Sequence, residues 1–348
     1  MQLNTTDLTL WCARVLRACG LPADDAATAA GLLVRSDARG YGTHGLTRLP
    51  SYVERLAAGD FNPRPHLVHR GFAGGIVLDA DGAMGHVAAP HAIALALRAL
   101  DDVASILVVI RNCGHLGALG IHALQAAEAG ALCVLGQSTP PLLAMGGFSG
   151  PAIGHNPLAF GCPLPGQPPL VFDMACSVAA RGHILAAARE QRPIPDDWAV
   201  DAEGRPTTDA EAALAGALLP SGGHKGIGIA MLVQCLASGL AATAQSVAAA
   251  DTPVPTAGAV GGQSAFLWLV QPNDFAAAPD FARHMQDWTS HYLTRGGEGA
   301  RLPGARGAAL EARSQAAGLL IEGALLRDLT QLGERIAIPF PRARMETA

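Results

Sequence analysis

Charged residues are scarce in this sequence. Asp, Glu, Lys and Arg make up 15% of its 348 residues, against about 25% in an average soluble domain. Hydrophobic residues make up 50% of the chain. A surface so poor in charge predicts that part of it is buried against another subunit.

An excess of positive charge is absent as well. The formal net charge is −5 and the isoelectric point is near 6.2. Proteins that bind nucleic acids gather Lys and Arg on one face, so we expect no nucleic-acid partner. Any anion must be bound by a few local Arg and Lys side chains.

Paired cysteines and targeting segments are also missing. The seven cysteines include no Cys-x-x-Cys pair, which predicts free thiols in a reducing compartment. The first residues lack the basic and apolar regions of a signal peptide. The mostly apolar stretch 226–245 contains Gln234 and several glycines, which favours a buried helix over a membrane span. We therefore expect a cytoplasmic protein without a membrane partner.

The apolar pattern changes twice along the chain. Strands are predicted at 75–79, 104–110, 131–136, 157–162, 169–174 and 265–270. Helices are predicted at 5–19, 23–38, 50–58, 88–101, 119–129, 177–190, 224–246, 279–295 and 320–336. This order predicts an α/β body, residues 71–275, and a helical domain built from both termini, residues 1–70 and 276–348.

A glycine-rich loop follows the second predicted strand. Gly114-His-Leu-Gly117-Ala-Leu-Gly120 precedes a predicted helix, as a dinucleotide-binding loop does. Its spacing is Gly-x-x-Gly-x-x-Gly and not Gly-x-Gly-x-x-Gly, and the next strand ends in Gln137-Ser138 without an acid. A doubly wound nucleotide domain is therefore disfavoured. The amides of 115–119 still suit a cofactor phosphate at the start of a helix.

Two further motifs carry side chains suited to catalysis. His44 and Arg48 are four residues apart, a spacing that brings them together on a helix or on a turn entering one. An imidazolium transfers a proton at neutral pH, and a guanidinium fork binds a carboxylate; a surface His beside a surface Arg is the commoner outcome of such a pair. Gly-Gly-His-Lys-Gly at 222–226 places Lys225 at a helix start that favours phosphate, although it is not a Walker loop.

The segment 36–52, Ser-Asp-Ala-Arg-Gly-Tyr-Gly-Thr-His-Gly-Leu-Thr-Arg-Leu-Pro-Ser-Tyr, resembles the malate/L-lactate dehydrogenase family of NAD(P)-dependent oxidoreductases. This family includes malate, sulfolactate and ureidoglycolate dehydrogenases and the Δ1-piperideine-2-carboxylate and Δ1-pyrroline-2-carboxylate reductases. The resemblance covers most of the chain and continues, in order, through 114–118, 154–160, 172–175, 194–201, 204–209 and 217–226.

The resemblance implies both a fold and a site. The fold is a mostly antiparallel seven-stranded sheet with flanking helices and a helical domain, in a homodimer, and it is not a Rossmann fold. His44 becomes the proton donor, Thr43 its hydrogen-bonding neighbour and Arg48 the contact of the substrate carboxylate. The cofactor is NADP or NAD, with NADPH slightly favoured. Its expected contacts are His115, Leu116, Gly117, Ala118, Leu119, Asp173, Met174, Ala175, His224 and Lys225, with Arg301 and Arg306 as further candidates.

Three positions depart from the family pattern. Thr43 replaces the usual Ser and keeps the hydroxyl. His155 replaces a Thr that lines the substrate in relatives, so we count it as substrate-binding. His183 stands where many relatives carry Lys and the cyclic imine reductases carry an acid–base Asp, so we count it as catalytic. A His at 183 cannot supply the negative charge of that Asp, which argues against imine reduction.

These observations predict an NAD(P)-dependent oxidoreductase of a small 2-oxo or 2-hydroxy carboxylate. Two alternatives stay open: a cyclic imine reductase, and a non-catalytic nucleotide-binding regulator, which only the changes at 155 and 183 support. A metal site is not expected. The relevant histidines, which have no Asp or Glu at ligand spacing, are His44, His115, His155, His183 and His224.

Overall fold

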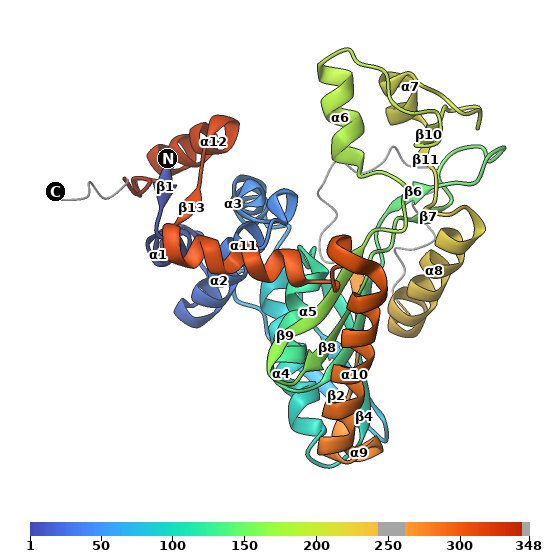
Figure 1. Ribbon diagram of the computed structural model, residues 1–348. Coiled ribbons are helices and arrows are strands. Elements are labelled where there is room, and N and C mark those ends of the chain that lie inside the picture. Colours follow the sequence, from blue (N-terminus) through green and yellow to red (C-terminus); the bar gives the residue numbers. More distant parts are fainter. Residues whose placement is uncertain (243–261, 343–348) are drawn as a thin grey trace.

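The computed structural model describes residues 1–242 and 262–342. Its centre is a seven-stranded sheet in the order β2-β3-β4-β12-β5-β8-β9 (Figure 1). These strands are β2 (Val68–Phe72), β3 (Gly75–Asp79), β4 (Ser105–Cys113), β5 (Leu132–Gln137), β8 (Leu158–Leu164), β9 (Gln167–Met174) and β12 (Gln263–Val270). All six strands predicted from the sequence are present.

The sheet is mixed and not purely antiparallel: it contains one parallel pair of strands among antiparallel ones. β3 and β4 pair in parallel, because α4 (Gly85–Ala99) carries the chain back to the starting edge between them. The other neighbouring strands of this sheet pair antiparallel.

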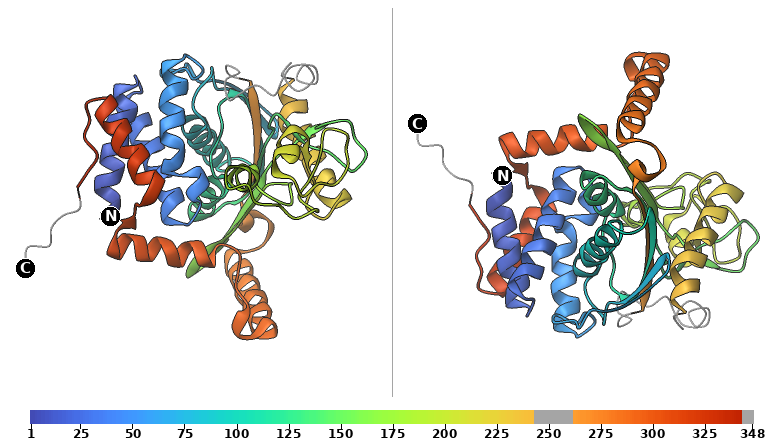
Figure 2. Two further views of the ribbon diagram at one scale, coloured as in Figure 1. Left: turned by 90° about the horizontal axis from the view of Figure 1, so that it is seen from above. Right: turned by 90° about the horizontal axis from the view of Figure 1, so that it is seen from below.

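Helices cover the two faces of the sheet unequally. α4 and α5 (Leu119–Glu128) pack against one face (Figure 2). On the other face, Phe266 of β12 packs against Val233 of α8 (His224–Gln234) and Ala237 of the π-helical turn Cys235–Gly239. Helix was predicted over 224–246, of which 243–246 lie outside the described residues.

A smaller lobe has its own four-stranded sheet, in the order β10-β11-β6-β7. Its elements are β6 (Pro141–Leu143), β7 (Ile153–Gly154), β10 (Ala199–Val200), β11 (Ala217–Leu218), α6 (Arg181–Arg189) and α7 (Ala210–Ala215). A separate apolar cluster that includes Leu143, Ile184 and Leu218 forms its core. The sequence did not predict these strands, because two or three residues are too few to show an alternating pattern.

Helices from both ends of the chain pack together. They are α1 (Thr5–Ala18), α2 (Ala23–Ala38), α3 (Leu49–Ala57), α11 (Ala305–Ala317) and α12 (Gly323–Arg335). β1 (Gln2–Leu3) pairs antiparallel with β13 (Leu319–Leu320), and the Trp11 indole donates to the carbonyl of Ile338 at 3.0 Å. The ion pairs of Arg35 and Arg39 with Glu311 join α2 to α11.

One helix stands away from the rest. After the short α9 (Pro272–Phe275), α10 (Ala278–Gly296) projects from the molecule (Figures 1 and 2). Phe281 and Met285 pack against the apolar cluster of β8 and β9, and of the residues of α10 only Thr289 is buried.

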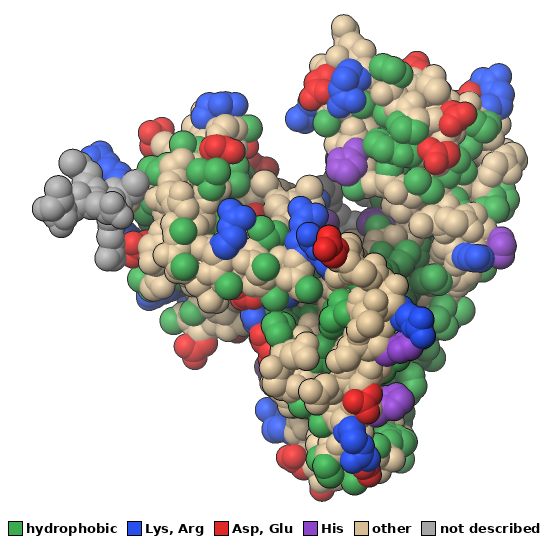
Figure 3. Space-filling model, in the orientation of Figure 1, with side chains coloured by type: hydrophobic (Ala, Val, Ile, Leu, Met, Phe, Trp, Pro, Cys, Tyr) green, Lys and Arg blue, Asp and Glu red, His purple; other side chains and the backbone are tan. Residues whose placement is uncertain are grey.

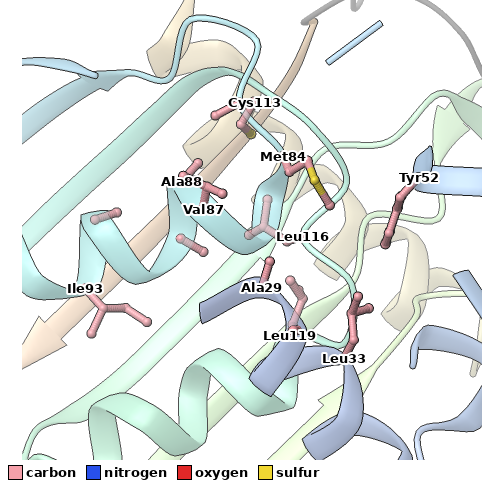
Figure 4. Close-up of a cluster of buried hydrophobic side chains, with 14 of the residues drawn as sticks. Ala29, Leu33, Tyr52, Met84, Val87, Ala88, Ile93, Cys113, Leu116 and Leu119 are labelled. Carbon is pink, nitrogen blue, oxygen red and sulfur yellow. The ribbon is translucent and has the colours of Figure 1, made fainter. Parts of the chain in front are cut away.

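One continuous core links the terminal helices to the sheet. Figure 4 shows part of it, with Leu33 of α2, Val87 of α4 and Leu119 of α5 in one cluster. The ring of Tyr52, from α3, belongs to the same cluster. This packing fixes the start of α3 against the loop before α5.

Candidate active site

The site is built on a short turn between α2 and α3. Two 3-10 turns, Gly42–His44 and Leu46–Arg48, are joined by Gly45 and lead directly into α3. Leu49 is helical although Pro50 follows it, so the turn and α3 are continuous. As the spacing predicted, His44 and Arg48 lie on one local structure.

Hydrogen bonds orient both functional side chains of this turn. The Thr43 hydroxyl lies 2.9 Å from Nδ1 of His44, which leaves Nε2 for a ligand. Nε of Arg48 donates to the carbonyl of Thr43 at 2.7 Å, which leaves its terminal nitrogens for a carboxylate. Arg48 is exposed and His44 is half-buried.

A second imidazole stacks on the first. The rings of His44 and His115 have centroids 5.6 Å apart and planes inclined by 28°. The hydroxyl of Tyr52 lies 2.8 Å from Nδ1 of His115. The predicted glycine loop therefore reaches the turn that carries His44.

Side chains that the sequence did not single out shape this loop. The amide of Leu116 donates to Oε1 of Gln137 at 3.0 Å, and Nε2 of Gln137 donates to the carbonyl of Gly114 at 3.0 Å. Nε2 of His122 lies 2.9 Å from the Leu116 carbonyl. The Leu116 amide is thus already used, although it was among the expected cofactor contacts.

His155 is the third imidazole of the site. Its Nδ1 lies 3.1 Å from the hydroxyl of Thr139, which leaves Nε2 available. Next to it, the side chain of the buried Asn156 accepts from the Thr139 amide at 2.9 Å and donates to Gln234 at 3.0 Å. The bonds of Thr139 and Asn156 therefore fix the position of His155, which departs from the family pattern.

The three imidazoles share a positive environment. Burial, Arg48 and His155 lower the pKa of His44 to about 4, and burial and Arg48 lower that of His155 to about 4. Burial, followed by the neighbouring His44 ring and Arg48, also lowers the pKa of His115. The rings are therefore neutral near pH 7, in surroundings that favour an anionic ligand.

The expected cofactor residues 173–175 lie at the end of β9, and the residues after them pair with the segment before α8. Oδ2 of Asp173 accepts from the amide of Gly120 at 2.7 Å, and burial raises the pKa of Asp173 to about 6. The amide of Cys176 donates to the carbonyl of His155, and the amide of Ser221 donates to the carbonyl of Cys176, both at 2.8 Å. Met174 and Ala175 are thus held between the glycine loop, His155 and the start of α8.

The start of α8 suits the phosphates of a dinucleotide. Gly222 and Gly223 both have φ of +62°, a conformation that side-chain-bearing residues rarely adopt. A Cβ at Gly223 would meet no neighbouring atom within 4 Å, so this backbone faces open space. His224 and Lys225 are exposed in the first turn of the helix, where the amides and the helix dipole favour anions.

Three predicted residues lie apart from this cluster. His183 is exposed on α6, and the centroid of its ring lies 6.0 Å from that of Trp198. Arg301 and Arg306 are exposed beside a loop that packs on β9, where the amide of Val171 donates to the carbonyl of Pro303 at 3.1 Å. α3 and α6 stand on opposite sides of a hollow in the surface (Figures 1 and 3).

Several residues that shape the site were not predicted. They are Asp37, Tyr52, His122, Gln137 and Thr139. Asp37 and Tyr52 lie inside the segment 36–52 that carries the family resemblance, which was the available hint. Among residues 1–242 and 262–342, no His, Cys, Asp and Glu side chains are grouped as a metal site, and no helix is long and apolar enough to cross a membrane.

Comparison with known proteins gives the chain's relatives. The sequence profile described as malate/L-lactate dehydrogenase matches residues 3–330. A (2R)-3-sulfolactate dehydrogenase (NADP(+)) of Chromohalobacter salexigens is 32% identical over 85% of this chain and 87% of its own length.

Two further relatives differ in their reactions. A ureidoglycolate dehydrogenase (NAD(+)) of Escherichia coli O157:H7 is 41% identical over 62% of each chain. The crystal structure of Δ1-piperideine-2-carboxylate reductase from Pseudomonas syringae pvar. tomato superposes with a TM-score of 0.86, at 30% identity, over 96% of this chain and 99% of that one.

Proposed function

Because this chain belongs to the malate/L-lactate dehydrogenase family and is an NAD(P)-dependent oxidoreductase, we propose that it interconverts a small 2-oxo carboxylate and its 2-hydroxy acid. The observation that carries the proposal is the turn on which Thr43 orients the His44 imidazole and the Arg48 guanidinium lies beside it. The family resemblance had predicted this class of reaction.

In this proposal the two side chains of the turn divide the work. Arg48 binds the substrate carboxylate with its free terminal nitrogens, which holds C2 in one place. His44 gives a proton to the C2 oxygen through Nε2 during reduction, or takes it from the hydroxyl during oxidation. A bound nicotinamide supplies or accepts the hydride.

The negative charge of the substrate favours the uptake, from solvent, of the proton that His44 needs for reduction. The free imidazole is neutral near pH 7, because burial and Arg48 lower its pKa to about 4. A carboxylate bound to Arg48 offsets the positive charge that His44 experiences, so its pKa rises on binding. Protonation of His44 is thereby coupled to the arrival of an acidic substrate.

We propose that loop 115–119, residues 173–175 and the first turn of α8 hold a dinucleotide, outside any Rossmann crevice. The open glycine backbone at 222–223 and the exposed Lys225 support this assignment. The relatives use NADP(+) or NAD(+), and we slightly favour NADPH, with Arg301 and Arg306 as contacts of its additional phosphate.

A homodimer is part of the proposal. Trp268 lies on β12, inside the seven-stranded sheet, yet 47% of its surface is exposed. α10 likewise exposes Trp288 and Tyr292. Large apolar side chains in these positions support burial against a second copy of the chain.

The test follows the absorbance of the reduced nicotinamide with NADPH and, separately, with NADH. The substrates are oxaloacetate, pyruvate, sulfopyruvate, 2-oxopantoate and Δ1-piperideine-2-carboxylate. We expect turnover with a 2-oxo acid, and a loss of about 100-fold or more in H44A, as is typical when a general acid is removed. H91A, at a His on α4, is the matched control and keeps the activity.

Two outcomes would replace this proposal. Turnover of the cyclic imine alone would make the protein an imine reductase despite His183. Cofactor binding, seen by fluorescence, without turnover of any substrate would make it a nucleotide-binding regulator.

A further inference from the structure

A carboxylate lies directly behind the turn that carries His44 and Arg48. Asp37 is in the last turn of α2, and its Oδ2 accepts a hydrogen bond of 2.6 Å from the amide of Leu46. Leu46 follows the joint between the two 3-10 turns. The bond therefore holds the turn at a point between its two functional side chains.

The backbone of Gly45, which joins the two 3-10 turns, packs closely against the same carboxylate. A Cβ built on Gly45 would lie 2.3 Å from Cγ of Asp37 and 2.4 Å from each of its oxygens. Only glycine allows the backbone to approach so closely. The side chain of Leu46 is fully buried in the core, so the turn is anchored on one side by apolar packing and on the other by Asp37.

Cations do not neutralise this carboxylate through the ion pairs of the described residues. The two arginines nearest to it on α2 pair elsewhere, Arg35 with Glu128 and Glu311, and Arg39 with Glu311. On the turn, Arg48 bonds to the Thr43 carbonyl and His44 to the Thr43 hydroxyl.

The packing of α1 adds one titratable group. Cys12 faces Asp37, and burial, followed by the charge of Asp37, raises the pKa of its thiol. The thiol is therefore neutral over the working range and offers no compensating charge. Asp37 thus depends on the Leu46 amide as its partner.

We propose that Asp37 is a positioning residue, whose carboxylate fixes the Gly45–Leu46 peptide and thereby the placement of His44 relative to Arg48. This inference rests on the proposed function of those two residues. Asp37 lies behind the turn and acts through the backbone that it holds.

The proposal has an unusual pH signature. Burial raises the pKa of Asp37 to about 7, while the bond from Leu46 lowers it. An ionised carboxylate accepts a hydrogen bond more strongly than the neutral acid does, so the turn becomes better fixed as pH rises through 7. In the free enzyme the imidazoles of His44 and His155 have pKa values near 4, so they do not produce a rise near pH 7 in kcat/KM, which reports the free enzyme.

Stability should change in the opposite direction. A carboxyl whose pKa is raised in the folded protein binds its proton more tightly there than in the unfolded chain. Its contribution to stability is full below about pH 4, the ordinary pKa of an Asp, and is lost by about pH 7. Asp37 therefore makes the protein less stable as pH rises toward 7, and more active as pH rises through 7.

The experiment compares D37N, D37A and the matched control D24N, which changes an exposed carboxylate at the other end of α2. For each protein, kcat and KM are measured from about pH 5 to about pH 9, with the melting temperature and the Kd of the cofactor. D37N keeps an acceptor oxygen, so we expect it to retain most activity. Its kcat/KM should no longer rise through pH 7, and its melting temperature should no longer fall as pH approaches 7.

D37A removes the acceptor as well. We expect kcat/KM to fall about 100-fold, the usual cost of a small misplacement of catalytic groups, with the cofactor Kd unchanged. An activity limb near pH 7 that persists in D37N would overturn the proposal, and so would a D37A enzyme that melts earlier but keeps its kcat/KM.

Binding of oxamate, an unreactive 2-oxo carboxylate analogue, separates this inference from the proposed function. Oxamate that binds more weakly to D37A than to wild type, by a factor that grows as pH rises through 7, supports the positioning role even without turnover. A wild-type protein that neither turns over nor binds oxamate refutes the proposed function and the inference resting on it.

Discussion

At the scale of single residues, Arg48 acts on two neighbours at once. Among the described residues it has no ion-pair partner, and together with burial it lowers the pKa of His44 and of His155. The same guanidinium therefore influences both the affinity for substrate and the pKa values of the two imidazoles. A substitution that keeps its charge and one that removes it should have different effects.

We predict that R48Q raises the KM of the substrate and also raises the pKa of His44. Two charge-assisted hydrogen bonds of about 1.5 kcal/mol each correspond to roughly a 100-fold increase in KM. R48K is the matched control, because it keeps the charge and loses the planar fork; it should raise KM but leave the His44 pKa low. NMR titration of the His44 ring, together with steady-state kinetics, checks both. An unchanged His44 pKa in R48Q would contradict the argument.

The predictable part of the site consists of residues whose chemistry is visible in their type and spacing. His44 and Arg48 lie four positions apart on one turn, and Lys225 follows paired glycines. Asp37 acts through a backbone amide nine residues away. Tyr52 acts through a ring 63 residues away. The contact of a side chain with a distant amide or a distant ring depends on how α2, α3 and the glycine loop pack. No local sequence pattern encodes that packing.

At the scale of elements, the ion pairs of α2 connect the two ends of the chain. The Arg39 side chain is 4% exposed and pairs with Glu311 of α11, which also binds Arg35. Nε of Arg39 is buried without a hydrogen-bond partner within the described residues. Glu311 therefore supports a buried cation that has few other partners.

We predict that E311Q lowers the free energy of unfolding by about 3 kcal/mol, because breaking a buried pair leaves the charge of Arg39 uncompensated. E190Q is the control, since Glu190 pairs with Arg192 in the open, at 58% and 59% exposure. Exposed pairs contribute about 1 kcal/mol or less. Urea unfolding of both variants measures the difference. Equal midpoints would show that the α2–α11 pair contributes no more than an exposed one.

Elements with a strong periodic pattern were predicted, and weakly patterned ones were not. The strands of the large sheet that are buried on both faces appear in the sequence as apolar runs. β2 was missed because all five of its residues are exposed, and α11 was missed because none of its residues is buried. The predicted helix 177–190 begins only at Arg181, since Ser177 forms a bridge with Pro220. Tertiary contacts, and not local patterns, determine β2, α11 and the start of α6.

At the scale of the whole molecule, the exposed apolar surface predicts a dimer. We expect light scattering to give twice the chain mass of 35.6 kDa. W268E should shift the protein toward monomer, because it places a charge on a surface that a partner would bury. L10E is the control, since Leu10 is a 60% exposed apolar residue on α1. A wild-type monomer, or a W268E protein as dimeric as L10E, would argue against this interface.

The pairing of β1 with β13 has a consequence for biosynthesis. Residues 2–3 leave the ribosome long before residues 319–320, with which they pair. Trp11 likewise emerges long before Ile338, whose carbonyl accepts its hydrogen bond. The first helices therefore emerge without the surface that they finally cover. We expect the nascent chain to expose them until translation is nearly complete, which makes them a site for chaperones that bind near the exit tunnel.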